Sequence, residues 1–459
     1  MKNSPLKIFL LVLLVVLLLL PLQWLPDFTV GTYEVKRVAL LSDVLPDSAA
    51  QAGLPALPAL PADTGRSAVA TASAGDPRSS ARRDSCPKGV VCIEDYAAPG
   101  GQGMVPFYRA LGRAKSLGRP VRVAYLGDSF IEVDILTSSL RRMLQQRFGG
   151  SGVGYLEMAP PYAANRATVT QRSGGWATHC LLDKGRYERQ RLSLSGRYFL
   201  PQGTAWTEVR GVKQRGLDTA EVHTLYLRTS TQTEAGVKLG DGPMLALRAA
   251  GTGRIEALTQ TGRAGKVRWQ VPAGGGVTCW GVAEESRSGV VVDNYSLRGS
   301  SGTVLAEIPL QNLSELAAVR PYDLVVVQFG LNVANKKQLD YSHYAAQMKT
   351  VVEHLKQAFP GAGILLVGVG DREDRINGEL RTLPGILALS RYQQRLAADC
   401  QVAFWNLFEG MGGEGSIRRM AEAKPAEAGK DYTHINMHGG ERVAKALFKA
   451  IMHGYEQHR

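Results

Sequence analysis

The chain has 459 residues, which is too long for one ordinary domain and leaves room for two or three. A hydrophobic content of 44% and a charged content of 21% are typical of a globular protein, so wholesale disorder, collagen and coiled coil are excluded. The 54 Lys and Arg exceed the 41 Asp and Glu and give a net charge of +13, which favours anionic surroundings such as acidic glycans or lipid headgroups. We expect no nucleic-acid binding, because no compact basic motif with interleaved aromatics occurs.

The N-terminus is the most apolar part of the chain. Residues 8–25 are apolar apart from Gln23, and Lys2 and Lys7 precede them. As a helix this run would span about 27 Å, close to the thickness of a bilayer core. We therefore predict a transmembrane anchor over residues 1–26, with the lysines in the cytoplasm and the rest in the periplasm or another extracytoplasmic space. The alternative is a cleaved signal peptide, although no small-x-small cleavage site directly follows the run.

A tether and a cysteine-poor folded part follow the predicted anchor. Residues 45–85 are dominated by Ala, Pro, Ser and Gly, so we predict an extended tether over 27–85. Five cysteines outside the cytosol permit two disulfides and one free thiol. Cys86 and Cys92 could close a small loop, Cys180 and Cys279 share one segment, and Cys400 remains, but the connectivity is open. No CxxC motif or Cys/His cluster indicates a metal.

Two kinds of pattern alternate in the folded part. An apolar strand over 121–126 precedes a helix over 134–148, and the α/β rhythm resumes with strands over 289–294, 323–329, 364–369 and 402–407 and helices over 341–358, 386–398 and 440–453. These predict a parallel sheet covered on both faces. Between them lie short alternating runs separated by glycine turns, at 191–194, 222–228, 244–248 and 267–271. We therefore expect an α/β domain, 86–155 and 289–459, split by an inserted β-sandwich, 156–288.

The first polar turn follows the first predicted strand. Gly127, Asp128 and Ser129 come directly after the run 121–126 and before a predicted helix. Open α/β sheets place ligands at the carboxyl ends of their strands, and a helix N-terminus there favours developing negative charge. Ser129 is thus a candidate nucleophile. The alternative is a plain helix N-cap, a position that Asp and Ser also prefer.

A possible base for this serine lies near the C-terminus. Asp431 precedes His434 by three residues, just before a predicted helix. A serine nucleophile needs a base to take its proton, and the base needs a carboxylate to fix its tautomer. Asp431 and His434 could supply both from one loop. The alternatives are a helix start with chance polar residues, or His438 as the base, which has no upstream carboxylate at the same spacing.

Two further strand ends carry groups that could hold an oxyanion. Asn332 follows the strand predicted over 323–329, and its side-chain amide could donate a hydrogen bond. Gly299 and Gly302 follow the strand predicted over 289–294, where the lack of a Cβ lets a backbone amide approach an oxygen. Each signal alone is also that of an ordinary turn between a strand and a helix.

In chain order, these four turns resemble the sequence blocks of the SGNH (GDSL-like) hydrolase superfamily. The resemblance implies a three-layer α/β/α domain in which Ser129 is the nucleophile, His434 the general base and then acid, and Asp431 the group that orients it. Gly302, Asn332 and the Ser129 amide would form the oxyanion hole. Gly302 is preferred to Gly299 because its Ser-Gly-Thr string resembles the second block of the family.

The resemblance covers residues 121–155 and 289–455. Phe130 replaces the Leu of the usual GDSL string, and Val333 stands where many members have an Asp. The run from Gly127 to Gly154 looks like a branch that deacetylates envelope glycans and that commonly joins the core to a jelly-roll carbohydrate-binding module.

Other polar features are given structural interpretations. We expect Glu132 and Asp134 to complement a helix dipole rather than form a glycosidase pair. The charged run 371–375 is expected to be a solvated loop, although it could touch substrate. Trp176, Trp206, Trp269 and Trp280 are expected to fill the core of the β insert rather than stack on sugars.

These observations predict a membrane-anchored serine esterase that removes acyl groups, chiefly acetyl, from an envelope glycan or another glycan. No metal or organic cofactor is needed. One alternative is an O-acyltransferase that uses the same three residues beside a multipass membrane acyltransferase. Another is a non-catalytic glycan-binding scaffold.

Overall fold

The computed structural model describes residues 28–30, 33–35, 86–212 and 220–458. The chain divides into two units, 1–74 and 75–459. In the first unit, β1 (Phe28–Val30) and β2 (Tyr33–Val35) pair antiparallel inside the segment predicted as a tether. The predicted anchor over 1–26 lies outside the described residues. Among the helices that are described, none is both long and apolar enough to cross a membrane.

A six-stranded sheet forms the centre of the second unit. Its strands are β3 (Glu94–Asp95), β4 (Val121–Gly127), β14 (Val290–Ser296), β15 (Leu324–Gln328), β16 (Gly363–Val367) and β19 (Ala403–Trp405). Their order is β14-β4-β15-β16-β19-β3, and all neighbours pair parallel except β3, which is antiparallel to β19. Continuous Val, Leu and Ile runs make these strands buried on both faces, as predicted. The strands predicted from sequence are confirmed, and β3 is additional.

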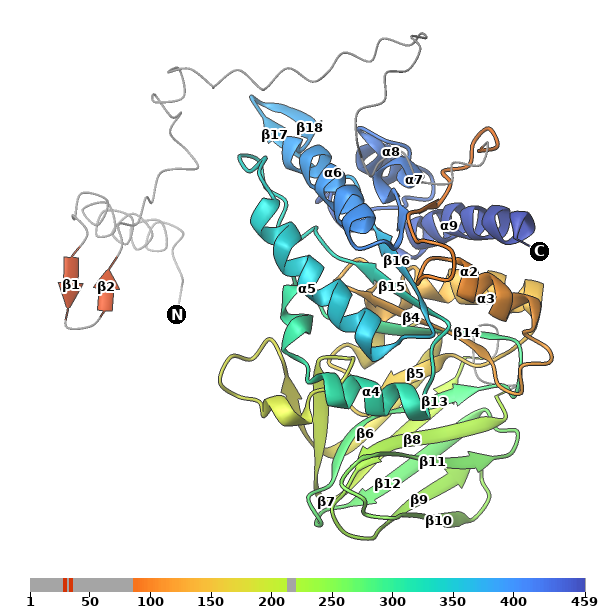
Figure 1. Ribbon diagram of the computed structural model, residues 1–459. Helices are drawn as coiled ribbons and strands as arrows, with labels where there is room; N and C mark the ends of the chain where they lie inside the picture. Colours follow the sequence, from red (N-terminus) through yellow and green to blue (C-terminus); the bar gives the residue numbers. More distant parts are fainter. Residues whose placement is uncertain (1–27, 31–32, 36–85, 213–219, 459) are drawn as a thin grey trace, which may run out of the picture. The chain divides into compact units, whose positions relative to one another are not determined.

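Helices cover both faces of this sheet (Figure 1). They are α2 (Val105–Gly112), α3 (Thr137–Phe148), α4 (Leu310–Val319), α5 (Ser342–Ala358), α6 (Pro384–Asp399), α7 (Leu407–Met411), α8 (Ser416–Glu422) and α9 (Met437–Gln457). α3 packs on α9, whereas α5 packs on both α4 and α6. After β4 the chain passes to β14 on one side of it, and then returns to β15 on the other side. Because both crossovers are right-handed but run in opposite directions, the pair α3 and α9 lies on one face of the sheet and the group α4, α5 and α6 on the other. The predicted three layers are therefore present.

The register aligns the carboxyl ends of three neighbouring strands. Gly127 at the end of β4 pairs with Ser296 of β14 on one side and with Gln328 of β15 on the other. The segments that follow these three residues therefore leave the sheet on the same side, at the carboxyl ends of the strands. The candidate serine, glycine and asparagine lie in these segments.

The strands between β4 and β14 form a separate antiparallel sheet. They are β5 (Gly154–Glu157), β6 (Val169–Cys180), β7 (Arg197–Gly211), β8 (Val222–Arg228), β9 (Thr233–Leu239), β10 (Met244–Ala249), β11 (Ile255–Thr261), β12 (Lys266–Pro272) and β13 (Thr278–Glu285). The sheet runs β10-β9-β12-β7-β13-β8-β11, and β10 and β11 at its two ends contact each other, so it folds over into a sandwich-like body. Its apolar core includes Trp269 and Val237, both fully buried.

The tryptophans of this body differ in burial. Trp269 is fully buried in the core of the β body, as predicted, whereas Trp280 is fully buried in the hydrophobic cluster that includes the α/β domain. Trp176 and Trp206 are only half-buried, and Arg268 lies 4.0 Å from the centroid of the Trp206 ring. The two buried side chains cannot stack on a sugar.

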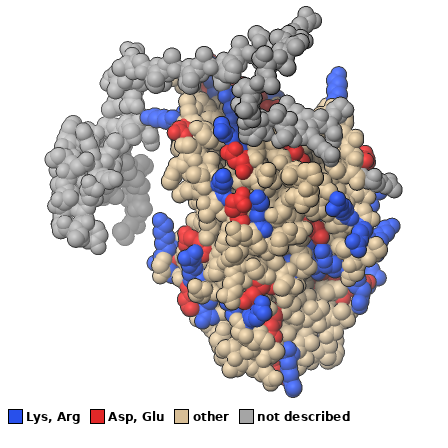
Figure 2. Space-filling view, viewed as in Figure 1, with Lys and Arg blue, Asp and Glu red and all other residues tan. Residues whose placement is uncertain are grey.

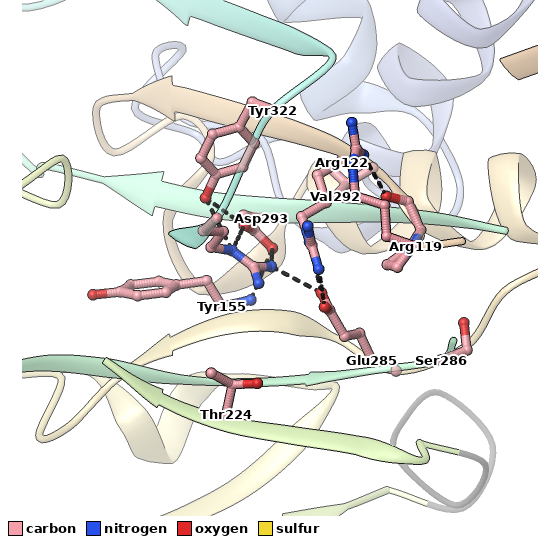
Figure 3. A network of polar contacts seen from close by, with 12 residues as sticks. Arg119, Arg122, Tyr155, Thr224, Glu285, Ser286, Val292, Asp293 and Tyr322 are labelled. Atoms are coloured by element: carbon pink, nitrogen blue, oxygen red, sulfur yellow. Dashed lines mark hydrogen bonds and ion pairs between the residues drawn. The ribbon is translucent and has the colours of Figure 1, made fainter. Parts of the chain in front are cut away.

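A buried polar network joins the β body to the parallel sheet (Figure 3). Glu285 at the end of β13 accepts hydrogen bonds from Arg122 of β4 and from Arg320, at 3.1 Å each. Arg320 also donates to both carboxylate oxygens of Asp293 in β14, at 2.7 and 2.8 Å, and the Tyr322 hydroxyl donates to Asp293 at 2.6 Å. Burial alone would raise the pKa of Asp293, but the Arg320 guanidinium holds it below its usual range. The paired charges therefore fix the last strand of the β body against the sheet.

Two sequence predictions in this region are wrong. Residues 191–194 form no strand, because side chains instead of a neighbouring strand bind their carbonyls: Trp280 Nε1 donates to Arg191 O at 2.8 Å, and Asn312 Nδ2 to Leu192 O at 2.6 Å. A short 3₁₀ helix, Arg189–Arg191, ends at the first of these residues.

The suggested Cys180–Cys279 pair is also wrong. A disulfide joins Cys86 to Cys92, but Cys180, Cys279 and Cys400 are free and buried. Cys180 and Cys279 lie on β6 and β13, which flank β7 on opposite sides. Two strands separated by a third are about 10 Å apart, beyond the ~7 Å that a disulfide can bridge between Cα atoms.

Figure 2 shows that Lys and Arg are interspersed with Asp and Glu on the face it displays. On that face the net positive charge is not gathered into a single patch.

Candidate active site

Ser129 lies in the turn at the end of β4. Gly127 is the last residue of β4. A Cβ at this position would come within 3.0 Å of Gln328 O and of the Ile131 side chain, so any residue other than glycine would force these neighbours to shift. Asp128 then shapes the turn by accepting a hydrogen bond from the Phe130 amide at 2.9 Å. Ser129 is 8% exposed, so it is nearly buried in this turn.

The turn continues through two residues with left-handed backbone conformation, and buried hydrogen bonds stabilise them. Val133 and Asp134 have φ of +48° and +68°, an unusual conformation for a β-branched residue. Asp134 is fully buried, and its carboxylate accepts hydrogen bonds from four side chains: Thr137, Arg141, Arg166 and Thr168, at 2.7 to 3.4 Å. Burial alone would raise the pKa of Asp134, but Arg141 and Arg166 hold it far below its usual range. The expectation that Asp134 merely complements a helix dipole is therefore wrong.

His434 reaches the serine from the loop before α9. Its Nε2 lies 3.2 Å from Ser129 Oγ, and its Nδ1 lies 2.7 Å from Asp431 Oδ2. The other oxygen of Asp431 accepts hydrogen bonds from the amides of Thr433 and His434, at 3.1 Å each. Tyr432, between them, has a φ of +50°, which turns the chain so that the carboxylate folds back on the imidazole. The structure thus places Ser129, His434 and Asp431 in one hydrogen-bonded chain.

The electrostatics define how this chain is protonated. Partial burial would raise the pKa of Asp431, but its hydrogen bonds with His434 and the Thr433 amide lower it, so the carboxylate is ionised. A carboxylate can only accept, so Nδ1 of His434 carries the proton and Nε2 is free to accept the Ser129 proton.

His438 does not share this arrangement. It is exposed in the first turn of α9, where its amide donates to the Asn436 side chain that caps the helix.

Gly302 and Asn332 lie, like Ser129, just beyond the carboxyl ends of their strands. Gly302 has a φ of +90°, and a Cβ there would lie 2.6 Å from the Phe329 ring, whereas a Cβ on Gly299 would meet nothing within 4 Å. The Gly302 amide donates to Ser300 Oγ at 3.0 Å. The Asn332 amide donates to Asp128 Oδ2 at 3.1 Å and to Ser300 O at 3.0 Å. Both predicted donors are therefore engaged with Ser300 or Asp128 in this structure.

The Ser129 amide is different. No hydrogen bond involves it among the residues that are described, so it is available to a substrate oxygen.

Sequence reasoning missed the roles of Asp128 and Ser300. Asp128 is 2% exposed, and burial raises its pKa to about 6 although the Phe130 amide and His434 act in the opposite direction. Its position beside the serine was visible in the sequence, but its burial against Asn332 depends on the pairing of β4 with β15. No local pattern indicated that Ser300 would bind both Gly302 and Asn332.

The charged run 371–375 is not a solvated loop. Asp371 is fully buried and accepts hydrogen bonds from Thr382, Ser416 and the Ile417 amide, at 2.7 to 3.2 Å. Part of the run forms β17 (Glu373–Ile376), which pairs with β18 (Glu379–Thr382). The Glu373 amide donates to Tyr432 O at 3.1 Å, so this hairpin supports the loop that carries His434.

Within the described ranges, no group of three or more His, Cys, Asp and Glu side chains is placed to hold a metal ion. The arrangement can still transfer a proton from a serine to a histidine without one.

Comparison with known proteins bears on the fold. The chain is similar to a solved structure of a peptidoglycan O-acetylesterase, with 19% identity and a TM-score of 0.67 over 80% of this chain and 99% of the other. The two share a fold. This likeness is one of fold, and it agrees with the mixed α/β architecture, with its parallel sheet and sandwich-like β part, that is described above.

A family two carbohydrate esterase from Clostridium thermocellum also matches, with 11% identity over 57% of this chain and 96% of the other. Its TM-score of 0.27 is too low to support an argument about this fold. No protein-family model matches the sequence. No curated protein matches it.

Proposed function

We propose that this protein is a serine esterase that removes O-acetyl groups from a glycan. The observation that carries the proposal is the chain from Ser129 Oγ to His434 Nε2, 3.2 Å, and from His434 Nδ1 to Asp431, 2.7 Å. A nucleophile, a base and an orienting carboxylate in hydrogen-bond contact are the parts that acyl transfer requires. The shared fold with a peptidoglycan O-acetylesterase supports the choice of an acetylated glycan as substrate.

The proposed reaction has two halves. Ser129 Oγ attacks the ester carbonyl carbon while His434 Nε2 takes the hydroxyl proton. The ester C–O bond then breaks, the sugar oxygen takes the proton from His434, and acetyl-Ser129 remains. Water attacks this ester, gives a proton to His434, and releases acetic acid as the proton returns to Ser129 Oγ. The products are one deacetylated hydroxyl and one acetic acid for each water consumed.

The oxyanion is stabilised by the Ser129 amide together with Gly302 and Asn332. The Ser129 amide is free to donate, whereas Asn332 and Gly302 are bound to Ser300 and Asp128. Substrate binding must therefore exchange the contacts with Ser300 for contacts with the ester oxygen. Such tightening on binding is common in hydrolases of this kind.

We further propose that residues 1–26 anchor the protein and that the folded part faces an oxidising, extracytoplasmic space. The Cys86–Cys92 disulfide supports the compartment, because disulfides persist where thiols are not kept reduced. Membrane fractionation with protease treatment of intact cells tests this. Retention of the full chain in the soluble fraction would refute the anchor.

The decisive experiment for the function is Ser129→Ala in the full chain. We expect wild type to release acetate from p-nitrophenyl acetate and from O-acetylated glycans, and Ser129→Ala to fall to the background rate. Ser116→Ala is the matched control, since Ser116 is exposed and bonds only locally to Arg113 O. Undiminished activity of Ser129→Ala would refute the proposal. Release of free acetate supports an esterase, whereas acetate recovered on an added oligosaccharide would identify a transferase.

A further inference from the structure

Tyr344, in the first turn of α5, contacts the loop that carries Gly302. Its hydroxyl donates a hydrogen bond to Ser301 O at 2.9 Å. Tyr344 is 7% exposed, so water has little access to this bond. Ser301 O and the Gly302 amide belong to one peptide group, and that amide is one of the three donors proposed for the oxyanion. Tyr344 therefore binds the far end of a group that takes part in the proposed reaction.

The direction of the Gly302 N–H depends on how this peptide group is turned. A trans peptide group is planar, with its C=O and N–H on opposite sides, so a contact that fixes Ser301 O also fixes the Gly302 N–H. One of the two rotations that turn the group is φ of Gly302, which is +90°. Glycine has no Cβ and rotates more freely than any other residue. The orientation must therefore come from contacts outside the glycine.

Helix α5 holds this loop and the segment that follows it. α5 packs on the 3₁₀ helix Thr303–Glu307, which begins directly after Gly302. Beyond that helix, His354 Nε2 lies 2.7 Å from Ile308 O, and since a carbonyl can only accept, the histidine donates. Two side chains of α5 thus bind carbonyls before and after the short helix. The Phe329 ring also bounds Gly302 and leaves no room for a Cβ.

The Tyr344 hydroxyl keeps its proton. Burial raises the pKa of this hydroxyl above its usual range, and the nearby Asp128 carboxylate acts in the same direction. The hydroxyl is therefore a donor in neutral and mildly alkaline solution. A hydrogen bond to a peptide carbonyl also polarises the group, which strengthens its N–H as a donor. Tyr344 thus both orients and polarises the Gly302 amide.

Ser300 lies at the donor end of the same peptide group. The Gly302 amide donates to Ser300 Oγ at 3.0 Å, and the Asn332 side chain donates to Ser300 O at 3.0 Å. When an ester oxygen replaces these acceptors, both contacts with Ser300 are lost. The bond from Tyr344 is at the opposite end of the peptide group, so this exchange does not break it.

We infer that Tyr344 is a positioning residue, which holds the Gly302 amide in the direction of the ester oxygen while the acceptor of that amide changes. The inference rests on the proposed esterase function and deepens it. Tyr344 acts only through the Ser301 carbonyl. Its effect should therefore appear in the step that develops negative charge, and not in the binding of the ester.

Tyr344→Phe tests this inference, because it removes the hydroxyl and keeps the ring. The substrates are p-nitrophenyl acetate and its thiono analogue, in which sulfur replaces the carbonyl oxygen. Sulfur accepts hydrogen bonds weakly, so the thiono ester gains little from the oxyanion donors. In the full chain we expect Tyr344→Phe to lower kcat on p-nitrophenyl acetate about tenfold, with KM nearly unchanged. The loss on the thiono ester should be no more than about twofold, so the ratio of the two rates should fall.

Tyr392→Phe is the matched control. The Tyr392 hydroxyl donates to Asp340, just before α5, at 3.0 Å, and this bond does not involve the loop that carries Gly302. The control should leave the ratio unchanged. Because a misfolded fraction lowers both rates equally, the ratio also separates a loss of folded protein from a loss of oxyanion stabilisation.

Two results would overturn the inference. One is an unchanged kcat on p-nitrophenyl acetate, and the other is an equal loss on both esters, which would give Tyr344 a purely structural role. If wild type hydrolyses the thiono ester too slowly to measure, kcat per Ser129 that reacts with diethyl p-nitrophenyl phosphate decides instead, and an unchanged value overturns the inference. A wild type inactive on p-nitrophenyl acetate, or an active Ser129→Ala, would instead refute the proposed function.

Discussion

Asp128→Asn is expected to stabilise the folded protein at neutral pH. Asp128 is buried beside Ser129, and burial raises the pKa of its carboxyl to about 6, from an ordinary value of 3.8. The ionised form is therefore less stable in the folded chain than in the unfolded one. Asn has nearly the same shape, and its carbonyl can still accept from the Phe130 amide, which donates to Asp128 at 2.9 Å. Its NH2 cannot accept from the Asn332 amide, which loses Asp128 Oδ2 as an acceptor but keeps Ser300 O, so about 3 kcal/mol is an upper limit to the gain.

The magnitude follows from the two pKa values. Each tenfold change in proton affinity is worth 1.36 kcal/mol, so the ionised carboxylate costs about 3 kcal/mol of folding free energy above pH 6. The sign follows from the direction: a raised pKa in the folded state favours folding at low pH, and this advantage disappears as the pH rises through 6. At pH 4.5 only the unfolded chain is largely ionised, so the cost is about 1 kcal/mol.

Urea unfolding of the wild type and Asp128→Asn at pH 8 and pH 4.5 measures both values. We expect the gain in unfolding free energy to approach 3 kcal/mol at pH 8 and to shrink to about 1 kcal/mol at pH 4.5. Asp183→Asn is the control, because Asp183 is exposed, and it should stay within about 0.5 kcal/mol of wild type. If Asp128→Asn lowered stability at pH 8, or raised it equally at both pH values, the reasoning would be refuted.

Further predictions concern the site and the network that supports it. Asn332→Ala should lower kcat on p-nitrophenyl acetate about 10²- to 10³-fold if its amide binds the oxyanion, and an unchanged kcat would exclude that role. Asp431→Asn should lower kcat roughly 10²-fold or more, because an amide can stabilise the wrong tautomer of the histidine. A steady-state pH profile should show that Asp431 itself is not titrated in mild acid, since its pKa is lowered. Ser300→Ala releases the Gly302 amide and should leave kcat undiminished, whereas a large loss would show that Ser300 positions the site. Asp293→Asn should lower the unfolding free energy by about 3–5 kcal/mol, measured by urea, because it removes the main partner of a fully buried guanidinium.

Much of the α/β architecture could be predicted because its signals are local. The runs at 121–126, 323–329 and 364–369 are apolar on both faces, and they became β4, β15 and β16 within two residues at each end. The helix predicted over 341–358 became α5, which begins one residue later, since its apolar period is unbroken. The run 191–194 failed for the opposite reason: its alternation was real, but side chains from elsewhere bound its carbonyls.

The members of the site could be predicted where the end of a strand determines the position of the residue that follows it. Ser129, Asn332 and Gly302 follow three strands whose ends are in register, and His434 lies in the loop just before the last helix. What sequence could not show is how each group is bonded. The engagement of Asn332 by Ser300 joins the loops that follow β14 and β15, and the contact of Asn332 with Asp128 joins segments 204 residues apart.

The β body takes part in forming the site, and this could not have been read from its own sequence. Arg166, from the inserted segment, donates to Asp134, and Asp134 holds the left-handed stretch that follows Ser129. The buried network around Arg320 fixes the other end of the insert, at Glu285, to the same sheet. Because the insert is held at both of its ends, the conformation of the serine turn and the position of Arg166 are not independent. A substitution that loosened either attachment should therefore lower the activity that depends on Ser129 as well as stability.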